Sequence, residues 1–72
     1  MESPADYLIR QFTDDRRRCQ QIAARLEQIA KPTVREEAEL RRVQESIARL
    51  DREIEGLKGR KAREAEAAQE AA

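Results

Sequence analysis

The stretch LRRVQESIARLDREIEGL, residues 40–57, decides the fold. Large aliphatic side chains recur in it at alternating steps of three and four residues, whereas nearly every other position is polar or charged. This spacing aligns the apolar side chains along one stripe of an α-helix and is the a/d heptad pattern of coiled coils. The stripe is made of Leu40, Val43, Ile47, Leu50, Ile54 and Leu57.

A second and less regular stripe precedes this one. It is made of Leu8, Phe12, Cys19, Ile22, Leu26 and Ile29. Asp15 interrupts it at a d position, where an aliphatic side chain is expected. Three further apolar residues, Ile9, Ala23 and Ala30, each follow a d position and widen the apolar face. We therefore expect the first helix to touch more than one neighbour, and its wider face is where the sequence places a partner.

Capping signals give the ends of both helices. Ser3 can accept a hydrogen bond from the third helical amide, and Pro4 falls at the first helical position, where its missing N–H costs nothing. Pro32 breaks the helical pattern, and Thr33 with Glu36 forms a capping box that restarts it. The prediction is a helical hairpin over residues 1–57, with helices at about 4–30 and 34–57 and a turn at 31–33. Residues 58–72, rich in Ala, Glu and Arg, form a helical or frayed tail.

Two topologies satisfy these stripes. The stripes share one heptad phase, so a continuous rod in an extended parallel coiled coil is the alternative fold. The antiparallel hairpin is favoured because proline and two polar core positions coincide at the centre of such a rod. It also gives every large apolar residue a partner layer: Leu26 with Leu40, Ile22 with Val43, Cys19 with Ile47, Phe12 with Ile54, and Leu8 with Leu57. The predicted class is an all-α, two-helix antiparallel coiled coil that assembles into a bundle.

Composition argues against several functions. Fifteen basic and fifteen acidic residues balance to zero formal charge, whereas nucleic-acid binders carry a basic domain or face. The chain has no His, no paired cysteines and no glycine-rich phosphate loop, so we expect no catalytic residues, no metal site and no cofactor. No leader-like segment and no long apolar window occur, which predicts a cytoplasmic protein without membrane insertion.

Two core positions leave alternatives open. Asp15 is either a register residue that pairs across the helices with a residue such as Arg49, or a solvated side chain near an open helix end. Cys19 is either a reactive or interchain thiol or, as its place on the stripe favours, a small hydrophobic core residue. The basic groups Arg16–Arg18 and Lys58–Arg63 are interpreted as solvated surface, with ordinary i,i+4 pairs such as Arg60 with Glu64.

A chain of 72 residues with this seam is expected to need a partner, because a single small core supplies only a few kcal/mol. We therefore predict a non-catalytic interaction module that binds itself or another helical protein, for oligomerisation or as an adaptor. In length and two-helix layout the chain also resembles the small hairpin co-chaperones of bacterial secretion needle subunits, with no motif in common. That resemblance implies the alternative function, a small heteromeric chaperone subunit that holds a helical client.

Overall fold

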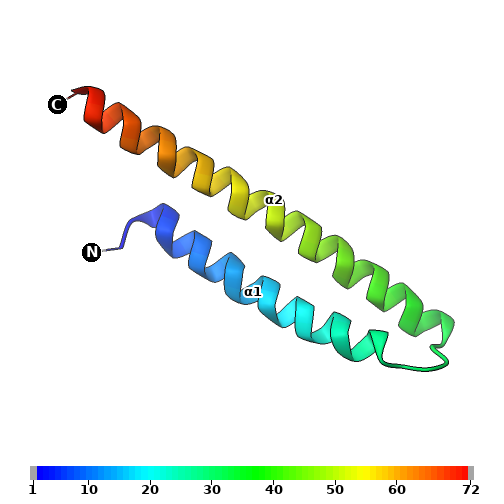
Figure 1. The fold of residues 1–72 in the computed structure, drawn as a ribbon. Helices are drawn as coiled ribbons and strands as arrows, with labels where there is room; N and C mark the ends of the chain where they lie inside the picture. The colour runs from blue at the N-terminus through cyan, green and yellow to red at the C-terminus, as the bar shows by residue number, and fades with distance from the viewer. Residues whose placement is uncertain (1, 72) are drawn as a thin grey trace.

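The molecule is an antiparallel helical hairpin, as the computed structural model of residues 2–71 shows (Figure 1). Helix α1 runs over Pro4–Glu27 and helix α2 over Val34–Ala71. The hairpin measures 60 × 19 × 13 Å. Its length equals that of α2 alone at about 1.5 Å per residue, and its width is that of two helices side by side. The predicted all-α hairpin is confirmed, and the parallel rod is excluded.

The start of α1 follows the predicted cap. Ser3 has an extended backbone, and its Oγ accepts a hydrogen bond from the amide of Asp6 at 3.1 Å. The carbonyl of Ser3 accepts the first helical bond, from the amide of Tyr7 at 3.0 Å. Pro4 opens the helix at a position where no amide is required. These contacts fix the residue at which the chain enters the hairpin.

The turn is longer than predicted and covers residues 28–33. Helix α1 ends at Glu27, whereas the sequence placed its end near Ala30. The amides of Gln28 and Ile29 donate to the carbonyls of Arg25 and Leu26, at 3.3 and 3.2 Å. Such i to i−3 bonds tighten the last turn and end the helix early. The prediction relied on Pro32 alone, which excludes a helix that continues through residue 32 but does not fix the residue at which the helix ends.

The predicted capping box at the start of α2 is present in both directions. The Oγ1 of Thr33 accepts from the amide of Glu36 at 3.1 Å, and the Oε1 of Glu36 accepts from the amide of Thr33 at 2.9 Å. Glu36 and Glu37 also place negative charge in the first turn, where the helix dipole favours it. Two otherwise unpaired amides are therefore satisfied where the chain reverses.

Helix α2 continues without a break through Gly56 and Gly59 as far as Ala71. The predicted boundary after Leu57 is therefore not an interruption of the helix. Glu64 lines the same small cleft as Ser3, so residues 65–71 extend past the beginning of α1 (Figure 1). The side chains of residues 65–70 are all exposed. This overhang has no helical neighbour in the hairpin.

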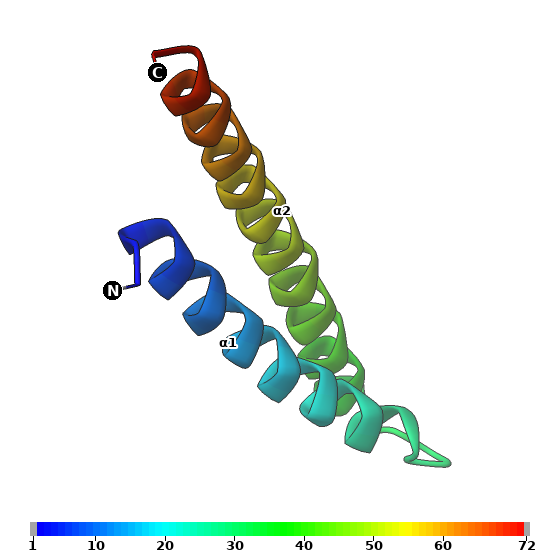
Figure 2. The same ribbon diagram turned by 60° about the vertical axis from the view of Figure 1, so that its left-hand side comes forward.

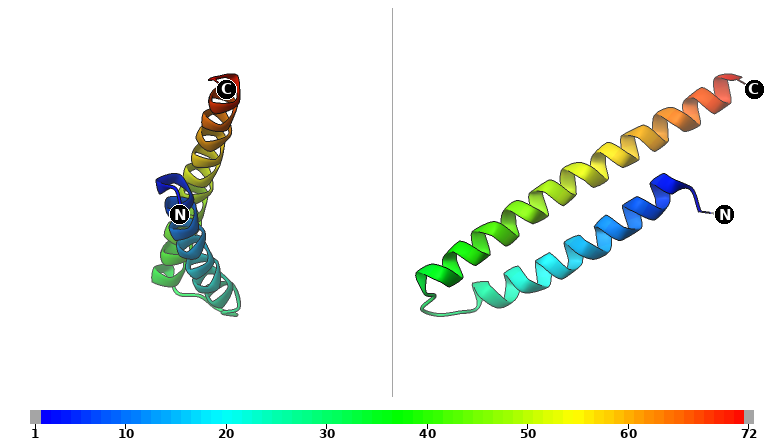
Figure 3. Two further views of the ribbon diagram at one scale, coloured as in Figure 1. Left: turned by 90° about the vertical axis from the view of Figure 1, so that its left-hand side faces the viewer. Right: turned by 180° about the vertical axis from the view of Figure 1, so that it is seen from behind.

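The two helices share a thin seam rather than a wide core. Within residues 2–70, only Ala23 and Ile54 are buried, at 6% and 2% exposure. Most other residues of the two stripes are half-buried, as expected when each side chain is covered by one neighbouring helix and not by several. The helices also cross at a shallow angle instead of running strictly parallel (Figures 2 and 3). The seam therefore has two unequal sides.

Candidate functional site

Ion pairs between the helices define how they are aligned. Arg16 Nη1 lies 2.7 Å from Asp51 Oδ1. Arg16 is one turn after Phe12 and Asp51 one turn before Ile54, so this pair lies next to the predicted layer of Phe12 and Ile54. In the next layer, toward the start of α1, Leu8 and Leu57 line one small cleft, as their predicted pairing requires.

A second ion pair joins Lys61 to the carboxylate of Asp6, near the start of α1. The Lys61 ammonium, and after it hydrogen bonds to Ser3, hold the pKa of Asp6 below its ordinary value of 3.8. Lys61 follows Leu57 at the next a position of α2. At this a position an ion pair therefore takes the place of an apolar contact. It joins the first turn of α1 to the part of α2 beyond Leu57.

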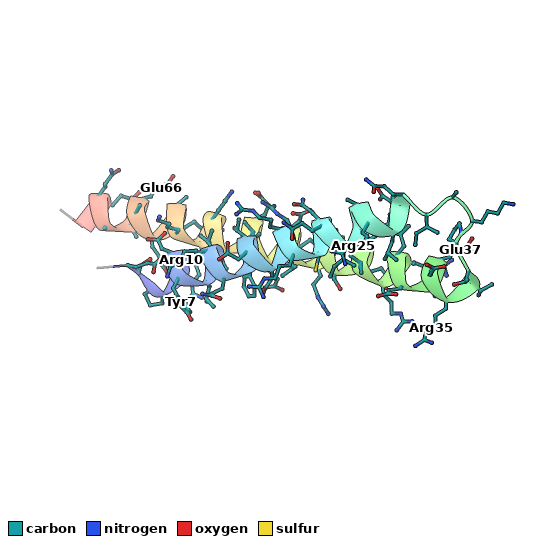
Figure 4. All side chains as sticks on the ribbon, turned by 90° about the horizontal axis from the view of Figure 1, so that it is seen from below. Tyr7, Arg10, Arg25, Arg35, Glu37 and Glu66 are labelled. Carbon is teal, nitrogen blue, oxygen red and sulfur yellow. The ribbon has the colours of Figure 1, made fainter. Side chains whose placement is uncertain are left out.

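The alignment gives the seam two distinguishable sides. Antiparallel helices that face each other present equivalent heptad positions to the same side. Arg16 and Asp51 both occupy e positions, so the e and b positions of both helices share one side, which we call the closed side. The d, g and c positions share the other, which we call the open side. Figure 4 agrees, because Tyr7 and Arg35, both at c positions, point toward the same edge of the hairpin.

Burial differs sharply between these sides on α1. Ala23, on the closed side, is 6% exposed, whereas its neighbour Ile22, on the open side, is 40% exposed. Leu8, two heptads before Ile22, is 39% exposed. Ile9, which follows Leu8 on the closed side, is half-buried. Helix α1 is therefore turned about its axis so that its a and e positions, rather than its a and d positions, face α2.

This rotation corrects one prediction. The sequence assigned the wider face of α1, with Ile9, Ala23 and Ala30, to an outside partner. The structure uses Ala23 to pack α1 on α2, and Ala30 lies in the turn. The large aliphatic side chains of α1 that are left exposed are instead Leu8 and Ile22, on the open side. Sequence spacing could not reveal this, because turning a helix about its axis leaves the heptad pattern unchanged.

Of the two interpretations of Asp15, the structure agrees with the solvated side chain, and Asp15 does not form the cross-helix pair with Arg49. Asp15 Oδ1 lies 3.5 Å from Arg18 Nη2, on the same helix, and not against Arg49. Both side chains of this pair are well exposed, at 48% for Asp15 and 69% for Arg18. We call the exposed side chains Leu8 and Ile22 the apolar strip of the open side. Asp15 lies one heptad after Leu8 and one heptad before Ile22, so it interrupts this strip. By contrast, the predicted pair of Arg60 with Glu64 is present at 3.2 Å.

The remaining seam residues lie between the helices as one half-buried line. Cys19 is a free thiol in this line. The half-buried members are Ile9, Phe12, Cys19, Leu26, Ile29, Leu40, Val43, Ile47, Leu50 and Leu57, with Ile54 fully covered. The structure therefore brings the sequence-predicted seam together, and it leaves Leu8 and Ile22 as the members with the most exposure.

Sequence reasoning missed a row of arginines on the open side. Arg35, Arg42 and Arg49 recur at seven-residue steps in α2 and are exposed. Arg42 and Arg49 line a shallow depression with Glu45, Ser46 and Arg52. The signal was present in the sequence, as a single residue type repeating at one heptad position, but the zero balance of total charge does not reveal it.

An aromatic contact adds to the surface at the start of α1. The guanidinium of Arg10 lies 5.9 Å from the centroid of the Tyr7 ring and 2.9 Å from Glu2 Oε2. Tyr7 is 50% exposed and belongs to the open side, close to Leu8 (Figure 4). A cation over a ring holds the aromatic side chain in place without covering it. Tyr7 therefore extends the uncovered apolar strip by one side chain.

The described part of the chain presents no concentrated reactive chemistry. Residues 2–71 contain no group of three or more His, Cys, Asp or Glu side chains placed to hold a metal ion. In the same range no helix is long and apolar enough to cross a membrane. No charged or polar residue is buried among those described. What the geometry offers is a surface, namely the apolar strip of the open side and the arginines beside it.

Comparison of the chain with protein-family models, with curated proteins and with solved structures found no match.

Proposed function

We propose that the chain is a non-catalytic helix-binding module, which serves oligomerisation or adaptor binding by adding at least one further helix to its hairpin. The observation that carries this proposal is the uncovered strip of the open side. Leu8 and Ile22 are 39% and 40% exposed although they belong to the same heptad stripe as the covered residues. A third helix lying between α1 and α2 on this side would cover both.

The thin seam supports the same conclusion. Only Ala23 and Ile54 fall below a tenth of full exposure among residues 2–70. A domain of this size usually buries more of its apolar surface or gains stability from a metal, a disulfide or association. For this hairpin, the additional stability would come from burying the apolar strip against another helix, because helices pack along strips of this kind.

Sedimentation equilibrium combined with circular dichroism over a range of concentrations tests the proposal. We expect the chain either to self-associate or to be a marginally stable monomer that gains helicity when a partner helix is added. Ile22→Glu should abolish that association, because it places a charge on a side chain that the partner helix would cover. Val34→Glu is the matched control, since Val34 is 84% exposed and lies outside the strip.

The variants distinguish the possible outcomes. Loss of association in Ile22→Glu with retained helicity, and unchanged association in Val34→Glu, supports the proposal. A stable monomer that binds no added helix contradicts it, as does association that both variants leave intact. If Ile22→Glu unfolds the hairpin, Leu8→Gln repeats the test at the other end of the strip, near the start of α1, where the side chain has fewer neighbours.

A further inference from the structure

The open side carries an excess of positive charge that the closed side lacks. Over residues 4–63, the c and g positions hold seven basic and three acidic residues. The basic ones are Arg18, Arg25, Arg35, Arg42, Arg49, Arg60 and Arg63, and the acidic ones are Asp14, Glu39 and Glu53. The d positions of the same side add Asp15 and Glu36, so the open side keeps an excess of two positive charges. The b and e positions hold Arg16, Arg41 and Lys58 against Asp6, Glu27, Glu37, Asp51 and Glu55. A chain of zero formal charge is thus divided into a basic and an acidic side.

Several of these arginines have no acidic partner. Within residues 2–71, Arg25, Arg42 and Arg49 form no ion pair, whereas Arg18 and Arg60 each pair with a carboxylate on their own helix. Arg42 and Arg49 are one heptad apart on α2, beside the d positions Val43 and Leu50. They therefore form one rim of the apolar strip, and Arg25 belongs to the opposite rim, on α1.

We propose, building on the proposed function, that the occupant of the open side is an amphipathic helix whose apolar stripe is flanked by acidic residues. Leu8 and Ile22 are two heptads apart, so the strip is roughly 21 Å long and accepts about four turns of helix. Glutamates on either side of that stripe would meet Arg25 on one rim and Arg42 and Arg49 on the other. Guanidinium groups pair with carboxylates through two parallel hydrogen bonds, which fixes the orientation of such a helix.

A second copy of the chain fits this surface less well. In a twofold contact the same side of each copy meets itself, so arginine-rich rims would lie against arginine-rich rims. Like charges across an interface disfavour association and select against that partner. The unpaired arginines therefore favour a different helix over self-association through the open side.

Fluorescence anisotropy with two synthetic peptides tests the proposal. Each peptide has leucines at a and d positions over about three heptads, and the flanking positions carry Glu in one peptide and Lys in the other. We expect the full chain to bind the Glu peptide at least about tenfold more tightly than the Lys peptide, and the preference to shrink between about 50 and 300 mM NaCl. Equal binding of the two peptides would overturn the proposal.

Charge-reversed variants locate the effect. Arg42→Glu with Arg49→Glu should weaken binding of the Glu peptide by about tenfold or more, whereas Arg41→Glu with Lys58→Glu, the same charge change on the closed side, should alter it by less than about twofold. Equal losses in both variants would show a general effect of net charge and overturn the proposal. Tighter binding of a duplex DNA than of the Glu peptide would also overturn it, since the arginines would then serve a phosphate backbone.

Failure of this proposal can be distinguished from failure of the proposed function. If Ile22→Glu abolishes helix binding while the Arg42 and Arg49 variant binds as the wild type does, the strip is used but the arginines do not choose the partner. Self-association through Ile22 with no binding of either peptide leads to the same conclusion. If Ile22→Glu binds the Glu peptide as the wild type does, the strip itself is not the site, and the proposed function fails as well.

Discussion

Ala23 and Ile22 are neighbours in the chain and lie on opposite sides of the seam. Ala23, on the closed side, is 6% exposed, and Ile22, on the open side, is 40% exposed. The smaller side chain is the better covered one, because a residue with only a Cβ lets the backbones of two helices approach closely. On the open side, the larger side chains Leu8 and Ile22 of α1 are left exposed. The difference teaches that side-chain size, and not hydrophobicity alone, decides which side of this hairpin is left for a partner.

The largest effect should come from the best-covered residue of the seam. Ile54 is 2% exposed, so Ile54→Ala removes buried methyl groups and leaves a cavity, which costs about 2–4 kcal/mol of unfolding free energy. Ile22→Ala should cost only about 1 kcal/mol, because much of that side chain already contacts solvent. Urea unfolding followed by circular dichroism measures both. Equal losses would show that the two sides are covered alike and would remove the contrast between them.

Overfilling the closed side should give the next largest effect. Ala23→Leu places a larger side chain at the best-covered position of α1 and should cost about 1–3 kcal/mol. Ala24→Leu is the matched control, since Ala24 is exposed and follows directly on the same helix. It should change the unfolding free energy by less than about 0.5 kcal/mol. If Ala23→Leu is tolerated as well as the control, close approach at Ala23 is not what orients α1.

A smaller effect of opposite sign is expected at Gly56, which follows Arg49 at the next c position of α2. Gly56→Ala should raise the unfolding free energy by about 0.5–1 kcal/mol, because alanine loses less conformational freedom in a helix. No atom lies within 4 Å of a methyl group added there, and neither glycine has a positive φ angle. Thermal unfolding measures the gain. A loss of stability would indicate that Gly56 faces a neighbour that the hairpin alone does not contain, on the side proposed for the partner.

The smallest effect concerns the ion pair of Asp6 with Lys61 and its dependence on pH. The pKa of Asp6 is lowered, chiefly by Lys61, so the pair stabilises the folded state above the ordinary value of 3.8. That contribution is lost as the pH falls through the lowered pKa. A carboxyl titration by NMR should show Asp6 below 3.8 in the wild type and closer to 3.8 in Lys61→Met. An unchanged pKa in that variant would show that the cap at Ser3, and not Lys61, causes the shift.

Much of the fold was predictable from local signals. The step of threes and fours from Leu40 to Leu57, together with the capping residues Ser3 and Thr33, predicted two helices and their antiparallel arrangement. The end of α1 at Glu27 was missed because it depends on hydrogen bonds of the last turn, and no residue type marks those bonds uniquely. Helix ends are the least certain part of any such prediction.

The candidate site was predictable only in part. The sequence named Leu8 and Ile22 among the seam residues, but it could not show that they would be the exposed ones. That outcome depends on rotation of α1, which follows from contacts of Ala23 across the seam and not from the order of residues along α1. The pairing of Asp15 with Arg18 instead of Arg49 has the same origin, because turning α1 points Asp15 away from α2. The sequence thus predicts which residues form the seam, and three-dimensional packing decides which of them remain available.

The overhang of α2 past the start of α1 has a consequence for the motions of the molecule. Residues 65–70 are held only by hydrogen bonds of their own helix, with every side chain in solvent. A short helical end without tertiary contacts opens and closes by itself, independently of the rest of the chain. Its amides should therefore exchange with deuterium quickly, while the amides around Ile54 exchange only when the two helices separate. Amides of one helix therefore exchange at two very different rates. Binding of a partner on the open side should slow exchange of the amides around Ile54 and leave that of the overhang unchanged.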